Sequence, residues 1–488
     1  MLPRLAWQPV LAIAACVAVV LIVGAGGYGY HRDELYFLEA GQHLGFGYPD
    51  QGPLTPLLAR LMSDLDAGSL TVLRLPSALM AAAVVFVTGL LARDVGGGRT
   101  AQIVATSCCA VASAVLAVGH LLSTTTFDLL DWSLVCLLVV RAIRTENGPL
   151  WLAAGAVAGV GLLNKPLPAF LLFALAVAAL AVGPRDVLRS RWVWAGGLLA
   201  LAIWSPWVIW QAQHHWPQLK VSSNIAKGGS VSSQSRWVLV PFQFLLVSPV
   251  LAPVWVAGLV APFRREGLRR LRLFALAWVV LVVVFTVTGG KPYYLAGMFP
   301  ILLAMGSIPV AEWLGRGRSR GRTWLLAAGV ALSGLVSATI ALPIVPAKDA
   351  GTVIAMNADV GETIGWPQLV GEVAGAYRAA GPGAVIFTRN YGEAGAVDRY
   401  GPALALPAAF SGHNGFGYWG PPADAPGRVV LVGLSRSQQD ASFAGCRPYR
   451  RISNSAGVDN EESDREIAIC DRPRGRWTTL WPRLRHLS

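Results

Sequence analysis

The chain carries little charge for its length. Only 14% of its 488 residues are Asp, Glu, Lys or Arg, whereas a soluble protein of this size has about 25% charged residues. Because a soluble surface must be solvated by polar and charged groups, this shortage excludes a string of soluble domains. Hydrophobic residues make up 54% of the chain, and the mean hydropathy is +0.51. The composition therefore predicts an integral membrane protein.

Cysteine is also scarce, and its placement separates two regions. Cys446 and Cys470 are the only cysteines in the polar C-terminal tail, where an oxidising exterior would permit a disulfide between them. The other four lie in apolar segments, where packing is the expected role: Cys16, Cys108, Cys109 and Cys136.

Motifs of soluble enzymes are missing too. The sequence has no G-x-x-x-x-G-K-[ST] phosphate loop, no H-E-x-x-H zinc motif, no paired C-x-x-C and no G-x-S-x-G nucleophile elbow. An enzyme without a nucleotide site needs another activated substrate, and a membrane protein can take one from the lipid.

Long apolar segments are abundant instead. A helix that crosses a hydrocarbon core of about 30 Å needs about 20 mostly apolar residues. Eleven segments are candidates: 9–28, 76–92, 101–119, 128–141, 150–163, 167–182, 192–210, 237–261, 273–288, 294–314 and 323–343. The fifth and sixth are short and are predicted to form a tight hairpin, because Pro166 interrupts a helix between them. The first is longer than the apolar core of a signal peptide and is predicted to be a retained helix.

Basic residues indicate the orientation of these spans. With a cytoplasmic N-terminus, the inner loops hold most of the arginines, including five within 264–272 and four within 316–322. The positive-inside rule supports this orientation, and with eleven spans the C-terminal tail then lies outside the plasma membrane. This topology accounts for the net charge of +13, so nucleic acid is not predicted as a partner.

The first outer loop, residues 29–75, is the longest between spans. Its stretch 54–65 places leucines at helical spacing, with Arg60 and Asp64 on the polar side. An amphipathic stretch tethered between two spans is typical of a helix that lies in the membrane interface.

Asp33 and Glu34 follow the first span directly and would lie just above the lipid surface. Outward-facing carboxylates there are candidates for catalysis. Asp33 is equally well explained as a helix N-cap. Asp50, in a proline-rich segment of the same loop, is more often a turn residue than a catalyst.

Further polar side chains lie at the outer ends of other spans. Lys165, Lys291, Tyr293 and Tyr294 would suit the phosphate of a lipid carrier, since Lys supplies a charge and Tyr a directional donor. The alternatives are snorkelling for the lysines and the aromatic belt of the interface for the tyrosines.

His120, Asp128 and His215 also lie at the outer ends of predicted spans. Asp128 lies at the start of a span, where an ionisable residue is a functional candidate by default. His214 and His215 are adjacent and can bind one metal only in special geometry, so no metal site is predicted there.

Several of these segments resemble a known family. The run His31-Arg32-Asp33-Glu34-Leu35-Tyr36-Phe37, followed by Gly47-Tyr48-Pro49-Asp50-Gln51-Gly52-Pro53-Leu54-Thr55-Pro56, looks like the first periplasmic loop of bacterial family 39 glycosyltransferases. Thr126-Phe127-Asp128, Asn164-Lys165 and Lys291-Pro292-Tyr293-Tyr294 also look like family segments. These multi-span enzymes have the GT-C fold and are similar to protein O-mannosyltransferases and to the aminoarabinose transferases that modify lipid A. The resemblance covers roughly residues 1–345.

The resemblance implies transfer of a hexose or pentose from a polyprenyl-phosphate carrier on the outer face, with inversion at the anomeric carbon. It implies that Asp33, with Glu34 beside it, is catalytic, and that Asp33 is the general base for the acceptor hydroxyl. Lys165, Lys291 and Tyr293 or Tyr294 would then hold the lipid phosphate and stabilise the charge that it gains on leaving.

Asp50 and Asp128 match family positions that shape the acceptor or sugar pocket, and we expect His120 and His215 to line that pocket as well. The first loop departs from the usual pattern of two prolines after Asp-Gln, because the pair here is Gly52-Pro53.

The tail, 346–488, is predicted to be a small extracytoplasmic α/β domain beyond a GT-C-like membrane domain of residues 1–345. Its expected elements are a helix at 366–380, strands at 384–388, 428–434 and 466–470, and a helix that begins near Asn390. The glycine- and aromatic-rich stretch 411–420 suits sugar stacking or a packed loop.

The leading prediction is therefore a lipid-linked-sugar glycosyltransferase. A transporter or flippase of lipid-linked glycans would place charges near the middle of the membrane, whereas here acidic residues gather at one face. A polymerase or ligase of surface polysaccharide is a third alternative. The sequence leaves open the sugar and whether the acceptor is a lipid, a glycan or a protein. No cofactor is predicted, although Asp33 and Glu34 could support a divalent cation.

Overall fold

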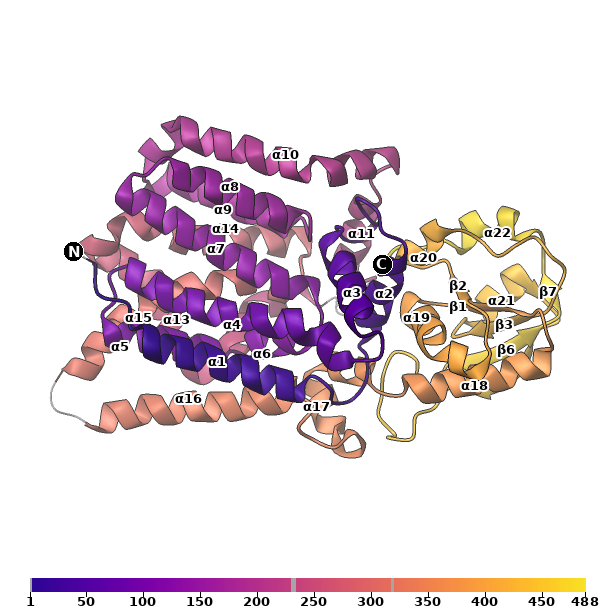
Figure 1. Cartoon of the computed structure of the whole chain (residues 1–488). Coiled ribbons are helices and arrows are strands. Elements are labelled where there is room, and N and C mark those ends of the chain that lie inside the picture. Colours follow the sequence, from indigo (N-terminus) through magenta and orange to yellow (C-terminus); the bar gives the residue numbers. More distant parts are fainter. Residues whose placement is uncertain (1, 230–233, 317–319) are drawn as a thin grey trace.

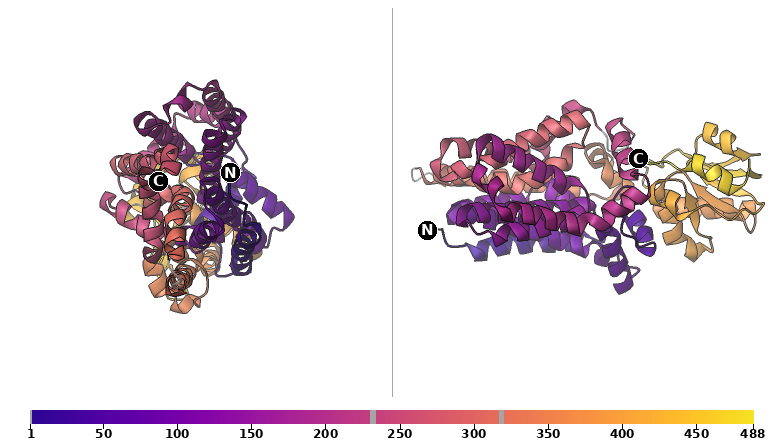
Figure 2. Two further views of the ribbon diagram at one scale, coloured as in Figure 1. Left: turned by 90° about the vertical axis from the view of Figure 1, so that its left-hand side faces the viewer. Right: turned by 90° about the horizontal axis from the view of Figure 1, so that it is seen from above.

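The computed structural model describes residues 2–229, 234–316 and 320–488, which form two parts arranged end to end (Figure 1). A helical bundle forms the first part, and the N-terminus lies at its far end. A small sheet domain forms the second part. Three short helices lie between the two parts (Figure 1 and the right-hand view of Figure 2): α2 (Arg32–Gln42), α3 (Leu54–Leu65) and α11 (Pro217–Ala226).

The bundle contains a helical counterpart for every apolar segment identified in the sequence. Its helices are α1 (Trp7–Gly24), α4 (Leu70–Asp94), α5 (Arg99–Ala110), α6 (Ser113–His120), α7 (Thr124–Thr145), α8 (Pro149–Leu162), α9 (Leu167–Val182), α10 (Arg191–Gln213), α12 (Leu239–Val247), α13 (Ala252–Arg264), α14 (Arg272–Thr288), α15 (Phe299–Gly315) and α16 (Arg320–Ala341). Their apolar side chains form one continuous core that includes the buried Trp132 and Trp255. The chain is a multi-pass membrane protein.

Fewer of these helices than the eleven predicted spans are long enough to cross a membrane alone. Within the described ranges, six helices have the required length and hydropathy, and there are up to eight candidates by length and composition if each bent pair counts as one span. The predicted spans 101–119 and 237–261 are the two bent pairs, with bends of 54° and 86°. Helices α8 and α9 have 14 and 16 residues, which is less than the length of a typical span.

The predicted hairpin between α8 and α9 is present. Helix α8 ends at Leu162, and α9 begins at Leu167 with Pro166 at its N-cap. Asn164 and Lys165 therefore lie in the turn, at the end of the bundle that faces the sheet domain.

The sheet domain has the predicted α/β character. Its elements are α18 (Trp366–Ala380), β1 (Val385–Thr388), α19 (Tyr391–Tyr400), β2 (Ala409–Ser411), α20 (Asn414–Trp419), β3 (Val429–Val432), α21 (Arg436–Ser442), β4 (Phe443–Ala444), β5 (Arg447–Arg451), β6 (Glu466–Cys470), β7 (Arg472–Pro473) and α22 (Trp477–Leu484). Helix α17 (Gly351–Met356) precedes this domain and lies at the end of α16 (Figure 1). The main sheet has the order β2-β1-β3-β6-β5, with β1 parallel to β2 and β3, and β6 antiparallel to β3 and β5. A separate antiparallel pair joins β4 and β7.

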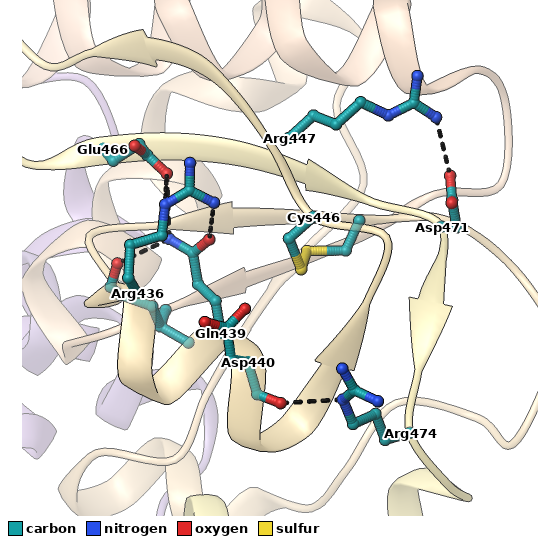
Figure 3. Close-up of a disulfide and its surroundings, with 10 residues drawn as sticks. Arg436, Gln439, Asp440, Cys446, Arg447, Glu466, Asp471 and Arg474 are labelled. Atoms are coloured by element: carbon teal, nitrogen blue, oxygen red, sulfur yellow. Dashed lines mark hydrogen bonds and ion pairs between the residues drawn. A yellow bond between two sulfur atoms is a disulfide. The ribbon is translucent and has the colours of Figure 1, made fainter.

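A disulfide joins Cys446 and Cys470 across the edge of this sheet (Figure 3). Arg447 and Asp471, each next to one cysteine, form an ion pair at 3.4 Å. The two tail cysteines, for which the sequence left pairing open, are thus bonded to each other.

One core is shared between the sheet domain and α2. Leu35, Tyr36 and Phe37 of α2 pack in the same buried cluster as Trp366 of α18 and Val397 of α19. Apolar surface of both α2 and the sheet domain is removed from contact with water here, which stabilises their association. The sheet domain is therefore packed on the first-loop helix and is not only linked to the bundle through the chain.

Glycine allows α19 to approach α2 closely. A Cβ atom on Gly395 would lie 2.9 Å from the backbone of Leu35, and one on Gly392 would lie 3.0 Å from Cβ of Arg32. Glycines three residues apart lie on one face of a helix, so this face of α19 packs against the backbone of α2.

Candidate active site

Charged side chains converge where the bundle meets the sheet domain. We use the term junction site for Asp33, Asp50, Asp128, Lys165 and Lys291. Lys165 interacts electrostatically with all three aspartates, and Lys291 interacts with Asp33 and Lys165. The junction site therefore brings together residues from the first loop, α7, the α8–α9 turn and the segment after α14.

The first turn of α2 determines which way its two acidic residues face. His31 is the N-cap: its Nδ1 accepts a hydrogen bond from the Asp33 amide at 3.2 Å, and its own amide donates to Glu34 Oε2 at 2.8 Å. This capping box provides hydrogen-bond acceptors for the free backbone N–H groups at the start of α2, so the Asp33 side chain is not needed for that purpose. The N-cap explanation of Asp33 is therefore wrong, and its carboxylate is available for another role.

Glu34 is fully buried and bound on both oxygens. The guanidinium of Arg74 donates to Oε1 and to Oε2, each at 2.8 Å, and the Leu122 amide also donates to Oε1 at 2.8 Å. Burial opposes ionisation, but Arg74 outweighs it and lowers the pKa of Glu34. Glu34 thus fixes α2 to α4, and the structure does not bring it into the junction site as the sequence suggested.

Asp33 faces the sheet domain and keeps 43% of its side chain accessible. Its Oδ1 accepts a hydrogen bond from the hydroxyl of Tyr391 on α19 at 2.7 Å. The surrounding protein partly desolvates this carboxyl, which opposes its ionisation, but neighbouring positive charge, including that of Arg32 and Lys291, and the Tyr391 hydrogen bond lower its pKa. Asp33 is therefore ionised and reachable, as a general base must be.

Asp50 also has a partner from the sheet domain. Its Oδ1 accepts from the Tyr36 hydroxyl at 2.8 Å, and its Oδ2 accepts from Asn414 Nδ2 at 3.0 Å. Burial raises the pKa of Asp50 to about 6 despite these bonds, and the nearby charge of Asp33 adds to the rise. The turn explanation therefore does not account for its side chain, which lies between α2 and α20.

The first loop is joined to the α8–α9 turn by Asn164. Its side chain accepts from the Thr55 hydroxyl at 2.8 Å and donates to Asp128 Oδ1 at 3.3 Å. Its backbone carbonyl accepts from the Gly52 amide at 3.0 Å, and a Cβ on Gly52 would collide with the Leu163 carbonyl. Proline has a Cβ and lacks the amide proton, so a proline at position 52 could make neither this close approach nor this hydrogen bond.

The two lysines and two tyrosines lie together, as expected. Lys165 Nζ is 5.1 Å from the centre of the Tyr294 ring and 5.6 Å from that of Tyr293, and Lys291 Nζ is 6.0 Å from Tyr293. Burial and the neighbouring charge of Lys165 lower the pKa of Lys291 to about 8. Burial also lowers the pKa of Lys165, although Asp128 and Asp33 oppose it. Lys165 and Lys291 thus place two amino groups beside the ring of Tyr293.

The two histidines lie away from this group. His120 is buried with its Nε2 3.5 Å from the Arg74 guanidinium, so it belongs with Glu34. His215 is exposed in the turn between α10 and α11, with a left-handed backbone. The structure does not bring either one into the junction site.

Asp33 and Glu34 do not form a cation site, because the oxygens of Glu34 are already bound to Arg74 and to two backbone amides. Among the described residues, ligand atoms of Glu362, Glu461 and Glu462 lie within 4.8 Å of one another. Arg32 pairs with Glu461 and with Glu362, and Arg389 pairs with Glu461 at 2.5 Å. Two guanidinium groups thus neutralise most of this charge, so we interpret the cluster as an ion-pair network that holds α2 to the sheet domain.

Sequence reasoning gave no site role to Tyr391, and it considered Asn414 only within the stretch 411–420, for sugar stacking or a packed loop. Each donates to a junction-site aspartate from more than 350 positions away in the chain, at separations of 358 and 364. The sequence does mark the start of α19 through the capping pair Asn390 and Glu393. Nothing in that local pattern connects α19 with the first loop.

Comparison with known proteins supports the resemblance. Residues 50–210 match the family described as dolichyl-phosphate-mannose-protein mannosyltransferase. This range contains Asp50, Asp128 and Lys165, whereas Asp33 and Lys291 lie outside it. No curated protein matches the chain in sequence.

Solved structures share the fold across nearly the whole chain. ArnT from Cupriavidus metallidurans in the apo state has a TM-score of 0.58 and 14% identity, covering 95% of this chain and 97% of its own. The same protein bound to undecaprenyl phosphate has a TM-score of 0.56 and 14% identity, with 96% and 98% covered. Arabinofuranosyltransferase AftD from Mycobacteria has a TM-score of 0.52 and 14% identity, covering 97% of this chain but 40% of its own. The predicted GT-C-like bundle with a small C-terminal α/β domain is confirmed.

Proposed function

We propose that this protein is an inverting glycosyltransferase that moves a sugar from a polyprenyl-phosphate carrier to an acceptor hydroxyl on the outer face of the plasma membrane. The observation that carries the proposal is the junction site. It combines an ionised, accessible carboxylate, Asp33, with two cations, Lys165 and Lys291, at one end of a membrane bundle.

The chemistry of such a transfer requires few groups. The acceptor oxygen attacks the anomeric carbon and forms a bond to it, while the bond from that carbon to the phosphate oxygen breaks. The acceptor proton passes to Asp33, and the bonding electrons leave with the polyprenyl phosphate. Because phosphate is already a stable anion, no strong general acid is needed at the leaving group.

Lys165 and Lys291 would stabilise the charge that the phosphate gains. Both act from a poorly solvated position, where electrostatic stabilisation of a developing charge is stronger than in water. The hydroxyls of Tyr293 and Tyr294 supply directional donors beside them. The ArnT complex with undecaprenyl phosphate, which shares this fold, supports a donor of that chemical class.

Asp50 and Asp128 would shape the space for the sugar or the acceptor. Asp50 is held by Tyr36 and Asn414, and Asp128 by Asn164. With a cytoplasmic N-terminus, the junction site and the sheet domain lie on the extracytoplasmic side, where polyprenyl-linked sugars would reach them from the outer leaflet.

The test is transfer of radiolabelled sugar from polyprenyl-phosphate donors by the purified full chain in detergent, with native membrane extract as the acceptor source. Asp33→Asn should lower transfer by at least about 100-fold, since a positioned general base contributes about 10²–10⁴. Asp66→Asn, an exposed aspartate of the same loop, is the matched control and should transfer at the wild-type rate.

Equal transfer by wild type and Asp33→Asn would remove Asp33 from the role of base. Binding of the donors without transfer of any of them would contradict the enzyme and favour a transporter or flippase of lipid-linked glycans. Extension of a glycan by whole repeat units would favour the polymerase or ligase alternative.

A further inference from the structure

The candidate base and the sheet domain are joined by a short hydrogen bond. The Tyr391 hydroxyl donates to Asp33 Oδ1 at 2.7 Å, across the contact between α19 and α2. The two residues are 358 positions apart, so this bond exists only when the sheet domain is seated on the first loop.

Tyr391 is held firmly on three sides. Its ring stacks on Tyr36 with centroids 4.7 Å apart and on His413 with centroids 4.6 Å apart. The Arg32 guanidinium lies 4.9 Å from the ring centre. Asn390 and Glu393 cap the helix that begins at Tyr391, so its backbone is fixed as well. A side chain constrained in this way can orient the group to which it donates.

The sheet domain also reaches the second carboxylate of the junction site. Asn414 donates to Asp50 Oδ2 at 3.0 Å, and the Gly415 amide donates to the Tyr36 hydroxyl at 3.1 Å, which in turn donates to Asp50 Oδ1. The stacked pair Tyr36 and Tyr391 thus carries one hydroxyl to each aspartate.

We propose that the sheet domain is part of the catalytic apparatus, and that Tyr391 is a positioning residue that orients the Asp33 carboxylate for proton abstraction. This inference rests on the proposed function. By binding Oδ1, Tyr391 restricts rotation of the carboxylate and leaves Oδ2 to accept the proton of the acceptor hydroxyl. The seating of one domain on the other then decides whether the base is in place.

The same hydrogen bond affects the ionisation of Asp33. A donor to a carboxylate favours its charged form, and Tyr391 is one of the groups that lower the pKa of Asp33. Loss of the hydroxyl should raise that pKa, so a larger share of Asp33 is protonated at any pH near it. The acidic limb of the pH–rate profile should therefore move to higher pH.

The experiment compares the full chain carrying Tyr391→Phe with wild type. Phenylalanine keeps the ring and its stacking and removes the hydroxyl alone. Tyr449→Phe makes the same chemical change at a partly exposed tyrosine of β5, away from the junction site, and serves as the matched control. Gel filtration and the melting temperature confirm that both variants are folded.

The first readout does not depend on activity. Carbodiimide-driven amide formation at Asp33 is followed against pH by peptide mass spectrometry, because the reagent requires the protonated carboxyl. Tyr391→Phe should shift the labelling curve of Asp33 to higher pH, and Tyr449→Phe should leave it unchanged. Identical curves for wild type and Tyr391→Phe would overturn the proposal.

The second readout is the transfer reaction. Tyr391→Phe should lower kcat by about tenfold, the scale of a hydrogen bond to a charged group, with little change in KM for the donor and with the acidic limb moved upward. A change in donor KM alone would contradict a positioning role. If the labelling curve shifts but wild type transfers no sugar, the hydrogen bond stands and the proposed function fails, so the two failures are distinguishable.

Discussion

Two adjacent carboxylates on α2 lie in opposite environments. Successive residues of a helix point about 100° apart, so Glu34 faces the bundle and Asp33 faces the sheet domain. Arg74 and backbone amides occupy the oxygens of Glu34, whereas Asp33 keeps an accessible side chain. Truncating Arg74 would leave a buried, unpaired charge, which costs about 3–5 kcal/mol. Glu34 therefore stabilises the position of α2, whereas the carboxylate of Asp33 remains available for the proposed role of general base.

Lys291 gives the candidate site a testable pH dependence. Burial and Lys165 lower its pKa to about 8, so the free protein carries this charge at pH 7 and loses it as the pH rises through 8. Affinity for undecaprenyl phosphate should fall by up to about tenfold between pH 7 and pH 9, because one pH unit above the pKa about 90% of the group is neutral. Isothermal titration calorimetry in detergent measures the change.

The control for this prediction is Lys291→Arg. A guanidinium remains charged throughout this range, so the affinity of the variant should fall less steeply with pH. An equally steep fall in both proteins would mean that Lys291 is not the group responsible.

At the residue scale, the sequence indicates which polar side chains share a location, and it does not indicate their partners. Lys165, Lys291 and Tyr293 lie at the same ends of their spans, and their clustering follows from the topology alone. The roles of Glu34 and His120 did not follow, because the partner of each, Arg74, comes from a different helix and its direction cannot be read from spacing. Tyr391 and Asn414 required the docked position of a second domain.

At the element scale, the contact between α2 and α19 depends on small residues. An added methyl on Gly395 would lie 2.9 Å from the Leu35 backbone, and backbone cannot rotate away as a side chain can. Gly395→Ala should destabilise the folded protein by about 1–3 kcal/mol through overpacking and should lower transfer by displacing Tyr391 from Asp33. Thermal unfolding and the transfer assay measure the two effects.

Gly371→Ala is the matched control, because nothing lies within 4 Å of an added Cβ on this glycine of α18. Alanine favours a helix over glycine, so this variant should be at least as stable as wild type. Equal stability and activity for the two alanine variants would contradict close packing of α19 on α2.

The elements themselves were largely predictable. The predicted helix 366–380 and strand 466–470 coincide with α18 and β6, because strong patterns and clear turn residues delimit them. The 86° bend between the helices at 236–247 and 249–264 was not predicted. The segment is apolar throughout, so its hydropathy gives no sign of a break. The one local signal is Pro249, which disfavours a helical conformation of Ser248.

At the scale of the whole molecule, the concentration of arginines in the loops on one side of the membrane predicts how the protein is oriented. The N-terminus and the sheet domain lie at opposite ends of the bundle (Figure 1). Ser437→Cys, on an exposed helix of the sheet domain, should react with a membrane-impermeant maleimide in intact cells that express the protein. Asn147→Cys, exposed in the loop between α7 and α8, should not react.

Permeabilised cells provide the control, since both introduced cysteines should then be labelled. Wild type supplies the background from its own free cysteines, of which Cys108, Cys109 and Cys136 are buried. Labelling of Asn147→Cys but not Ser437→Cys in intact cells would invert the proposed topology.

The bond between Asp33 and Tyr391 has a consequence for biosynthesis. At about 5–20 residues per second, a ribosome needs roughly 20–70 s to pass from one residue to the other, a stretch of 358 positions. During that time the first helices enter the membrane while the carboxylate has no tyrosine partner. A nascent or truncated chain is therefore expected to occupy the membrane without transferring sugar, and activity begins only after the last domain has been exported and seated.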